Sequence, residues 1–131
     1  MDYKTHNETS VQSNGTGLVG YITTTYQELV EAFGMPSDNY DDYKSDAEWE
    51  VEFADGTVAT IYNWKNGKNY CGEDGTHKTK ITEWNVGGNS KEASRLVLRV
   101  LGNKKAKKTN ETVIITKNAV IYNKQTNNYS K

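Results

Sequence analysis

The stretch from Trp49 to Trp64 constrains the fold of this chain more than any other, because its pattern predicts one β-hairpin. Three large apolar side chains alternate with three glutamates, and a period of two is typical of a half-buried strand. The apolar set is Trp49, Val51 and Phe53, and the acidic set is Glu48, Glu50 and Glu52. Asp55-Gly56 then predicts a tight turn, because glycine accepts the positive φ that short hairpin loops need. We expect the apolar side of the hairpin in the core and the acidic side in water.

The return strand of this hairpin is rich in β-branched and aromatic residues, which favour a pleated sheet. The register of the turn decides which of its side chains lie beside the glutamates. One register places Val58, Thr60, Tyr62 and Trp64 there, and the other places Ala59, Ile61 and Asn63 there. If Tyr62 and Trp64 point outward, the open face mixes acids with aromatics and suits a protein partner or a small ligand. If they point inward, they cover the margin of the core.

Two amphipathic helices are predicted. The first begins at Thr25, whose spacing from Glu28 is that of a capping box, and Gly34 is expected to end it. Its apolar face consists of Tyr26, Leu29, Val30 and Phe33. The second is expected to be capped by Asn89 or Ser90 and closed by Gly102. Its apolar face consists of Ala93, Leu96, Val97 and Val100.

Two shorter strands complete the predicted domain. Residues 18–22 predict an edge strand, and residues 80–86 predict a strand that Gly87-Gly88 breaks. Residues 18–102 therefore predict an α+β domain with the element order β-α-β-β-β-α. We expect a small antiparallel sheet with two helices packed on one face.

The two ends of the chain differ from this domain in composition. Residues 1–17 are polar and predict a flexible N-terminal arm. Residues 103–131 predict a basic linker and a C-terminal extension, in which residues 113–115 and 119–122 form a small β-hairpin. Two strands alone bury too little surface to be stable in water. The hairpin would therefore pack on the domain, on a second copy in a homo-oligomer, or on a partner.

The charge of the chain is nearly balanced overall but unevenly placed. The net charge is -1, whereas residues 38–55 hold eight acidic residues and one lysine, and residues 103–131 hold seven lysines and one glutamate. A general attraction to nucleic acid or membrane is not indicated. Cys71 is the only cysteine, which favours a reducing compartment. No stretch has the pattern of an export signal or the apolar length of a membrane span, so we expect a cytoplasmic protein.

The connection from residue 65 to residue 78 is the first candidate site. It carries Tyr70, Cys71 and His77 among three glycines, and long ordered loops are often functional. Cys71 and His77 are a conceivable nucleophile and base for a hydrolase, or zinc ligands together with Glu73. The chain lacks the paired cysteines of structural zinc sites, and the aspartates of residues 38–46 do not follow the calcium-loop pattern. We therefore predict no catalytic residue, no metal and no cofactor, and keep the hydrolase as a minor alternative.

The turn from Gly87 to Lys91 is the second candidate site. A glycine pair there leads from a strand into a helix N-terminus, where backbone N–H groups and the helix dipole favour an anion. Lys91 and Arg95 lie one helical turn apart and could add positive charge. The alternative is an ordinary tight turn with helix capping.

The element order also resembles that of a double-stranded-RNA-binding domain. Gly88-Asn89-Ser90-Lys91 opens the last helix, where that family presents lysines to phosphates. Lys91 matches the pattern, whereas Glu92 stands where the family has a second lysine. This resemblance implies a nucleic-acid-binding module that uses Lys91, Arg95, Arg99 and the lysines of residues 104–108.

A second resemblance covers about residues 17–102. The segments that carry it are Gly20–Tyr26, Leu29–Gly34, Glu48-Trp49, Asp55–Lys65 and Trp84–Gly88. They resemble a group of small uncharacterised proteins encoded by tailed phages and related mobile DNA. The resemblance implies a bacteriophage accessory protein made inside a host bacterium, and such proteins commonly block a host factor or sequester a host signal.

Together these observations predict a non-enzymatic viral protein with an anti-defence role. It would bind and inhibit a host factor, or sequester a small anionic, nucleotide-like signal. The alternative is the nucleic-acid-binding module. The residues predicted to bind the ligand are Tyr62, Trp64, Tyr70, His77, Gly87, Gly88, Asn89, Ser90, Lys91 and Arg95.

Overall fold

The computed structural model describes residues 1–37 and 43–104. Residues 1–101 form one compact unit, and residues from 102 onward belong to a second. The predicted C-terminal hairpin, most of the basic linker, and Asp38, Asp41 and Asp42 lie outside the described residues. Among the residues described, no helix is long and apolar enough to cross a membrane.

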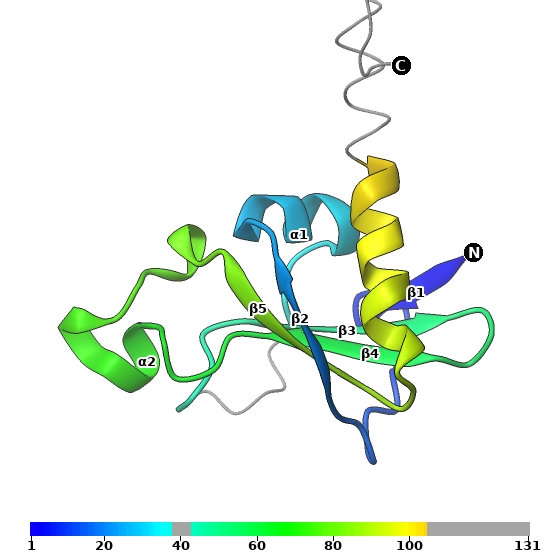
Figure 1. The fold of residues 1–131 in the computed structure, drawn as a ribbon, viewed down its shortest axis with the longest axis horizontal. Helices are drawn as coiled ribbons and strands as arrows, with labels where there is room; N and C mark the ends of the chain where they lie inside the picture. The colour runs from blue at the N-terminus through cyan, green and yellow to red at the C-terminus, as the bar shows by residue number, and fades with distance from the viewer. Residues whose placement is uncertain (38–42, 105–131) are drawn as a thin grey trace, which may run out of the picture. The chain divides into compact units, whose positions relative to one another are not determined.

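Five antiparallel strands form a single sheet in the order β1-β3-β4-β5-β2 (Figure 1). Their bounds are β1 Tyr3–Thr5, β2 Gly17–Thr23, β3 Glu48–Phe53, β4 Val58–Tyr62 and β5 Glu83–Gly88. The hairpin predicted from Trp49 to Trp64 is β3 with β4, at the middle of the sheet. Residues 18–22 lie in β2, an edge strand as expected.

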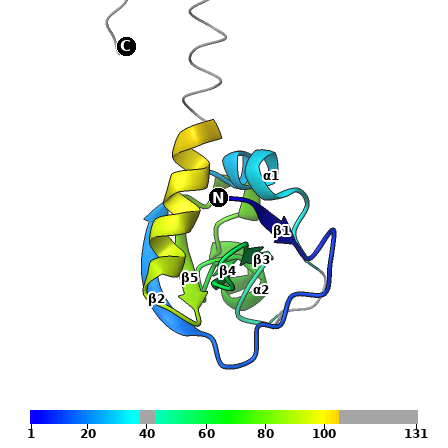
Figure 2. The same ribbon diagram turned by 90° about the vertical axis from the view of Figure 1, so that its right-hand side faces the viewer.

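Helices cover one face of this sheet. Figures 1 and 2 show α1 (Tyr26–Phe33) and a helix that begins at residue 92 on the same face. Leu29 and Phe33 from α1 and Val97 from the later helix join Trp49 and Trp84 of the sheet in one buried cluster. The predicted α+β fold, an antiparallel sheet with two helices on one face, is confirmed. The residues between β4 and β5 add α2 (Lys68–Cys71) and the 3₁₀ turns η1 (Gly72–Asp74) and η2 (Lys78–Lys80).

The start of α1 follows the predicted capping box. The Glu28 backbone N–H donates to Oγ1 of Thr25, and the Thr25 N–H donates back to Oε1 of Glu28, both at 3.0 Å. Gly34 ends the helix with a φ of 82°, a conformation that glycine adopts without strain. Gly102, in contrast, does not close the second helix, because residues 92–104 are all helical. Gly102 also lacks the positive φ of a C-capping glycine, so the prediction of a stop there was wrong.

The turn register of the central hairpin is settled by its cross-strand pairs. Glu48 lies opposite Tyr62, and Glu50 lies opposite Thr60. Residues directly opposite in an antiparallel pair share a face. Tyr62 and Thr60 therefore lie on the glutamate side, away from the helices, and Trp49, Val51 and Phe53 are buried as predicted.

Two predictions about β5 need correction. The strand begins at Glu83 rather than residue 80, because residues 78–80 form η2. Gly87 and Gly88 lie inside the strand instead of breaking it. A Cβ on Gly88 would lie 2.5 Å from the Cβ of Ala93, and one on Gly87 would lie 2.5 Å from Oγ1 of Thr60. These glycines thus permit close packing on both faces of the sheet.

The N-terminal residues also differ from the predicted flexible arm. Tyr3–Thr5 form β1 on the edge of β3, and the Tyr3 hydroxyl donates to the Ala32 carbonyl at 2.8 Å. The chain then crosses the open face, where the Ser13 hydroxyl donates to Oε2 of Glu50 at 3.0 Å. Glu50 is consequently only 7% exposed. The acidic side of the hairpin is therefore partly covered, not fully in water as expected.

Candidate functional site

A group of aromatic and lysine side chains gathers where β4 leaves the sheet. We call it the aromatic–lysine cluster, and it consists of Tyr43, Lys44, Tyr62, Trp64, Lys65 and Tyr70. The Tyr62 and Trp64 rings meet edge to face at 6.1 Å, and the Tyr43 and Tyr70 rings lie 5.2 Å apart. The Lys65 ammonium bridges the two pairs, at 5.8 Å from the Trp64 ring and 5.4 Å from the Tyr70 ring. Lys44 lies 5.2 Å from the Trp64 ring.

The cluster is exposed even though its members contact one another. Trp64 is 43% exposed, Tyr70 40% and Tyr43 60%. Exposed aromatic rings held by their neighbours have little conformational freedom left to lose when a partner covers them. Lys65 has a φ of 60°, which non-glycine residues seldom adopt. This backbone turn places its side chain between the two ring pairs.

The same face continues across the sheet from the cluster. Tyr62 is paired with Asn85, and Asn85 is paired with Tyr21 of β2, so the three side chains form a row. Burial raises the pKa of the Tyr62 phenol; its hydrogen bond with Asn85 opposes the rise, and Glu48 and Tyr21 add to it. Tyr21 and Leu18 are themselves exposed on this face. The open face therefore carries a band of aromatic and apolar side chains from β2 to residue 70.

A shallow hollow of about 220 Å³ lies beside Trp64 on this open face. The side chains around it are mostly hydroxyls, with one carboxylate and the two rings. The lining consists of Ser13, Thr16, Gly17, Ser45, Glu48, Thr60, Tyr62, Trp64 and Gly87. Pockets that enclose drug-sized ligands usually measure about 300–1,000 Å³. This hollow is thus a feature of a surface, too small to enclose such a ligand.

The loop that carries Lys65 and Tyr70 is fixed by buried polar side chains. Asn63, fully buried, donates from Nδ2 to Oδ1 of Asp46 at 2.8 Å and to Oδ1 of Asn66 at 3.0 Å. Oδ2 of Asp46 accepts from the Asn69 backbone N–H at 3.1 Å. Residues 65–80 contribute no buried apolar side chain. Their order therefore comes from polar bonds at the root of the loop, and the loop presents its side chains to solvent.

No known protein family model and no curated protein sequence matches this chain.

Cys71 and His77, the conceivable nucleophile and base, each bond to other groups. Cys71 donates through Sγ to the Lys65 carbonyl at 3.2 Å, and Nδ1 of His77 accepts from the Thr79 backbone N–H at 3.2 Å. Within the described part of the chain, the two side chains share no hydrogen bond. The same residues contain no group of three or more histidine, cysteine, aspartate or glutamate side chains placed to hold a metal ion.

His77 lies in a different hollow from Trp64. That hollow measures about 280 Å³ and is lined by Asp46, Lys68, Asn69, His77 and Lys78. Its cations already have neighbours, since Lys68 donates to the Glu73 carbonyl at 2.8 Å and Lys78 lies 5.8 Å from the Tyr26 ring. His77 thus lines a different hollow from Tyr62 and Trp64, the other aromatic residues predicted to bind the ligand.

The turn from Gly87 to Lys91 is used for internal bonds. Oδ1 of Asn89 accepts from the Val58 N–H at 2.9 Å, and Nδ2 of Asn89 donates to the Gly56 carbonyl at 3.2 Å. The Ser90 hydroxyl accepts from the Glu92 N–H at 3.2 Å. Arg95 pairs with Glu92 at 3.3 Å. These contacts favour the interpretation as a capped turn over an anion site, with Gly87 alone reaching the hollow beside Trp64.

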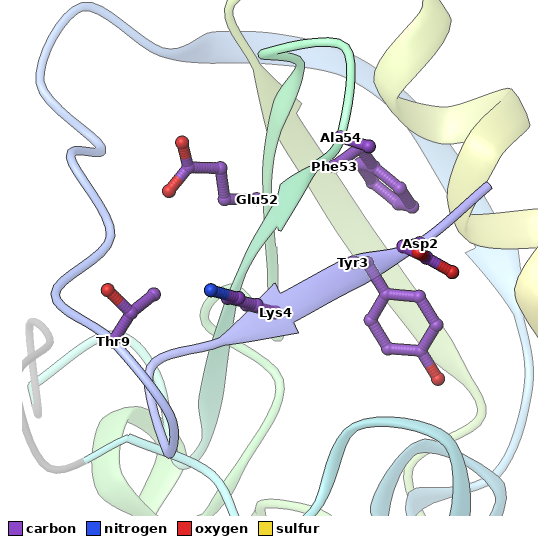
Figure 3. Close-up of a pocket in the computed structure, with 7 residues that line it drawn as sticks. All are labelled: Asp2, Tyr3, Lys4, Thr9, Glu52, Phe53 and Ala54. Carbon is purple, nitrogen blue, oxygen red and sulfur yellow. The ribbon is translucent and has the colours of Figure 1, made fainter.

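A further hollow, of about 290 Å³, lies at the β1 edge of the sheet (Figure 3). Figure 3 shows Lys4 and Glu52 on one side of the paired strands and the Tyr3 and Phe53 rings on the other. Its lining side chains thus point to opposite faces and do not converge on one point. We do not assign it a ligand.

Three members of the cluster were missed by sequence reasoning. Tyr43 and Lys44 lie in a segment whose aspartates dominate its pattern, and Lys65 begins the connection to residue 78 with no signal of its own. The available signal was that aromatic and lysine residues occur in the sequence just before β3 and again just after β4. Only the folded hairpin brings the two sides together.

Proposed function

We propose that this chain is a non-enzymatic binding protein of the phage accessory type, which inhibits a host protein by covering part of its surface. The observation that carries the proposal is the aromatic–lysine cluster, held in the open by a loop that adds nothing to the core. Ordering a polar loop costs conformational entropy. A loop that is ordered without serving the core favours a role in presenting its side chains to a partner.

The extent of the open face supports a macromolecular partner. Exposed aromatic or apolar side chains occur on β2 and in the loops beside β3 and β4, and the half-buried Tyr62 of β4 lies between them. Neighbouring strands lie about 4.8 Å apart, so the band from Tyr21 to Trp64 is wider than one aromatic ligand. Tyrosine and tryptophan are also the residues most often found at the centre of protein interfaces.

The partner surface is expected to be acidic with apolar side chains around the acids. The Lys65 ammonium lies beside Trp64, and a carboxylate of the partner brought to it would complement its charge. Nucleic acid fits this face less well, because Glu48 lines the hollow beside Trp64 and the phosphate backbone needs cations. Arg99 lies on the helix of the opposite face.

The test compares capture of host proteins by matched variants of the full chain. Immobilised wild type, Trp64→Ala, Lys65→Glu and the control Leu98→Ala are incubated with a lysate of the host bacterium. Leu98 is 49% exposed on the helix, so its variant removes similar apolar area elsewhere. We expect one protein that wild type and control retain and both cluster variants lose. Equal capture by all four, or capture by none, would contradict the proposal.

A second candidate is sequestration of a small, nucleotide-like anion, and one observation favours it. The Trp64 ring, two lysines and the hydroxyl-lined hollow lie together, which suits a stacked base, a phosphate and a sugar respectively. A thermal-shift screen with nucleoside phosphates and cyclic nucleotides tests it. Ligand at about 100 times its Kd should stabilise the protein by about 2.7 kcal/mol. Unchanged melting with every nucleotide would remove this candidate.

A further inference from the structure

The two edges of the sheet are built differently. The β1 edge has three residues, and its Lys4 lies opposite Glu52. The β2 edge has seven residues, Gly-Leu-Val-Gly-Tyr-Ile-Thr, with no charge and no proline. Proteins usually protect exposed edge strands with charges, prolines, short length or β-bulges. The β1 edge is short and charged, whereas the β2 edge is long and uncharged and carries only a bulge.

Backbone N–H and C=O groups lie along the outer side of β2. On the outer side of β2 no strand of the described residues is paired with it. Half of the N–H and C=O groups of an edge strand point away from the sheet. A long, uncharged and apolar edge of this kind pairs readily with another strand.

A β-bulge gives this edge an unusual side-chain pattern. The register between β2 and β5 shifts between Leu18 and Gly20, so Val19 is the extra residue. Leu18 is paired with Gly87 and Tyr21 with Asn85, which places both side chains on the open face. Leu18 is 51% exposed and Tyr21 is 68% exposed. Val19 packs partly against the core on the other side.

We infer that β2 pairs antiparallel with β2 of a second copy of this chain, about a two-fold axis perpendicular to the sheet. The bulge selects one register. Leu18 then lies opposite Tyr21 of the second copy, and Val19 lies opposite Gly20 of the second copy. Residues paired across two antiparallel strands share a face. Because of the bulge, only the register that pairs residue 18 with residue 21 and residue 19 with residue 20 keeps open-face residues together and core-face residues together.

Several features favour a second copy over an unrelated segment. The edge has no charge with which to recognise a foreign sequence, and none to repel its own copy. The same register covers Leu18 and Tyr21 in both copies at once, as a two-fold interface requires. A Cβ added to Gly17 would meet open space, and a Cβ added to Gly20 would meet only Ser94 of the same copy. One strand pair buries less than a standard interface, so we expect a weak dimer whose population depends on protein concentration.

Pairing in this way would join the two open faces into one surface on the same side of a ten-stranded sheet. Each copy contributes the five strands described above. The inference does not rest on the proposed function, because it concerns only the edge of β2.

Sedimentation equilibrium of the full chain over a wide concentration range tests the association. Wild type and the control Leu98→Lys should reach the dimer mass, and Leu18→Lys and Tyr21→Lys should remain monomeric with unchanged circular dichroism. A monomer for wild type at every concentration would overturn the inference. Dimers that persist in both edge variants would overturn it too.

Disulfide trapping tests the register without relying on destabilised variants. In a Cys71→Ser background, Leu18→Cys and Tyr21→Cys are prepared separately, oxidised alone and as a mixture, and run on a non-reducing gel. The mixture should form markedly more covalent dimer than either variant alone, because residue 18 faces residue 21 of the other copy. Equal cross-linking in all three samples would contradict the register.

Discussion

Asn63 donates a hydrogen bond from Nδ2 to Oδ1 of Asp46 at 2.8 Å, and both side chains are buried. Oδ1 of Asn63 in turn accepts from the backbone N–H groups of Asp46, at 2.7 Å, and Ala47, at 3.2 Å. One amide side chain thus ties the segment before β3 to the segment after β4. Because Tyr43 and Lys44 belong to the first segment and Trp64 and Lys65 to the second, this amide positions the aromatic–lysine cluster.

Replacing Asn63 by alanine should therefore destabilise the protein. The change leaves buried donors and an acceptor without partners, and we expect a loss of about 2–4 kcal/mol in the free energy of unfolding. Urea unfolding of Asn63→Ala against the exposed control Asn14→Ala measures it, and the control should lie within about 0.5 kcal/mol of wild type. A loss below about 1 kcal/mol for Asn63→Ala would mean that the network contributes little.

Alanine substitutions at Gly88 and Gly102 should have opposite effects on the stability of the protein. A Cβ on Gly88 would lie 2.5 Å from the Cβ of Ala93 and 3.1 Å from the carbonyl oxygens of Ser90 and Val58, and these atoms cannot easily move. We expect Gly88→Ala to cost about 2 kcal/mol. Gly102 is helical with open space around it, so Gly102→Ala should stabilise by about 0.5–1 kcal/mol. Thermal unfolding of both variants gives the two signs, and a stabilising Gly88→Ala would refute the packing role.

The N-terminal residues should contribute to stability, although their composition alone predicts the reverse. The Tyr3 ring packs at 5.6 Å from Phe33 and 6.0 Å from Phe53, and its hydroxyl donates to the Ala32 carbonyl. We expect Tyr3→Ala to lower the free energy of unfolding by about 2 kcal/mol. Lys4→Ala, on the exposed side of the same strand, should change it by less than about 0.5 kcal/mol. Chemical denaturation of both variants separates a packed strand from a flexible arm, for which the two changes would be equal.

Local sequence patterns predicted the helices and strands that are stabilised by residues close to one another in the sequence. The capping box of Thr25 and Glu28 and the alternation of Trp49, Val51 and Phe53 are signals of this kind. Long-range pairing could not be predicted in the same way. The strand β1 is only three residues long, and its partner β3 begins at Glu48.

The site was only partly predictable for the same reason. Tyr62 and Trp64 were named from the hairpin, but their outward direction depended on a register that the turn leaves open. Gly87-Gly88 has the composition of a break, whereas Thr60, distant in sequence, and Ala93, in the following helix, explain why small residues are needed there. The neighbours of Tyr70, namely Tyr43 and Lys65, come together only after β3 and β4 have paired.

Tyr62 should make the stability of the fold sensitive to alkaline pH. Burial raises the pKa of its phenol in the folded state, with Glu48 and Tyr21 adding to the rise against the hydrogen bond from Asn85. The folded state therefore holds this proton more tightly than the unfolded chain does. The resulting stability is fully present below the unfolded-state pKa, near 10, and is lost as the pH rises through the higher folded-state pKa.

Urea midpoints measured on both sides of about pH 10 test this prediction. Tyr62→Phe keeps the ring against Trp64 and removes the proton, so its midpoint should fall less than that of wild type as the pH rises. Deprotonation of lysines affects both proteins and cancels in the comparison. Parallel curves for wild type and Tyr62→Phe would show that the Tyr62 phenol is solvated and that its ionisation does not couple to folding.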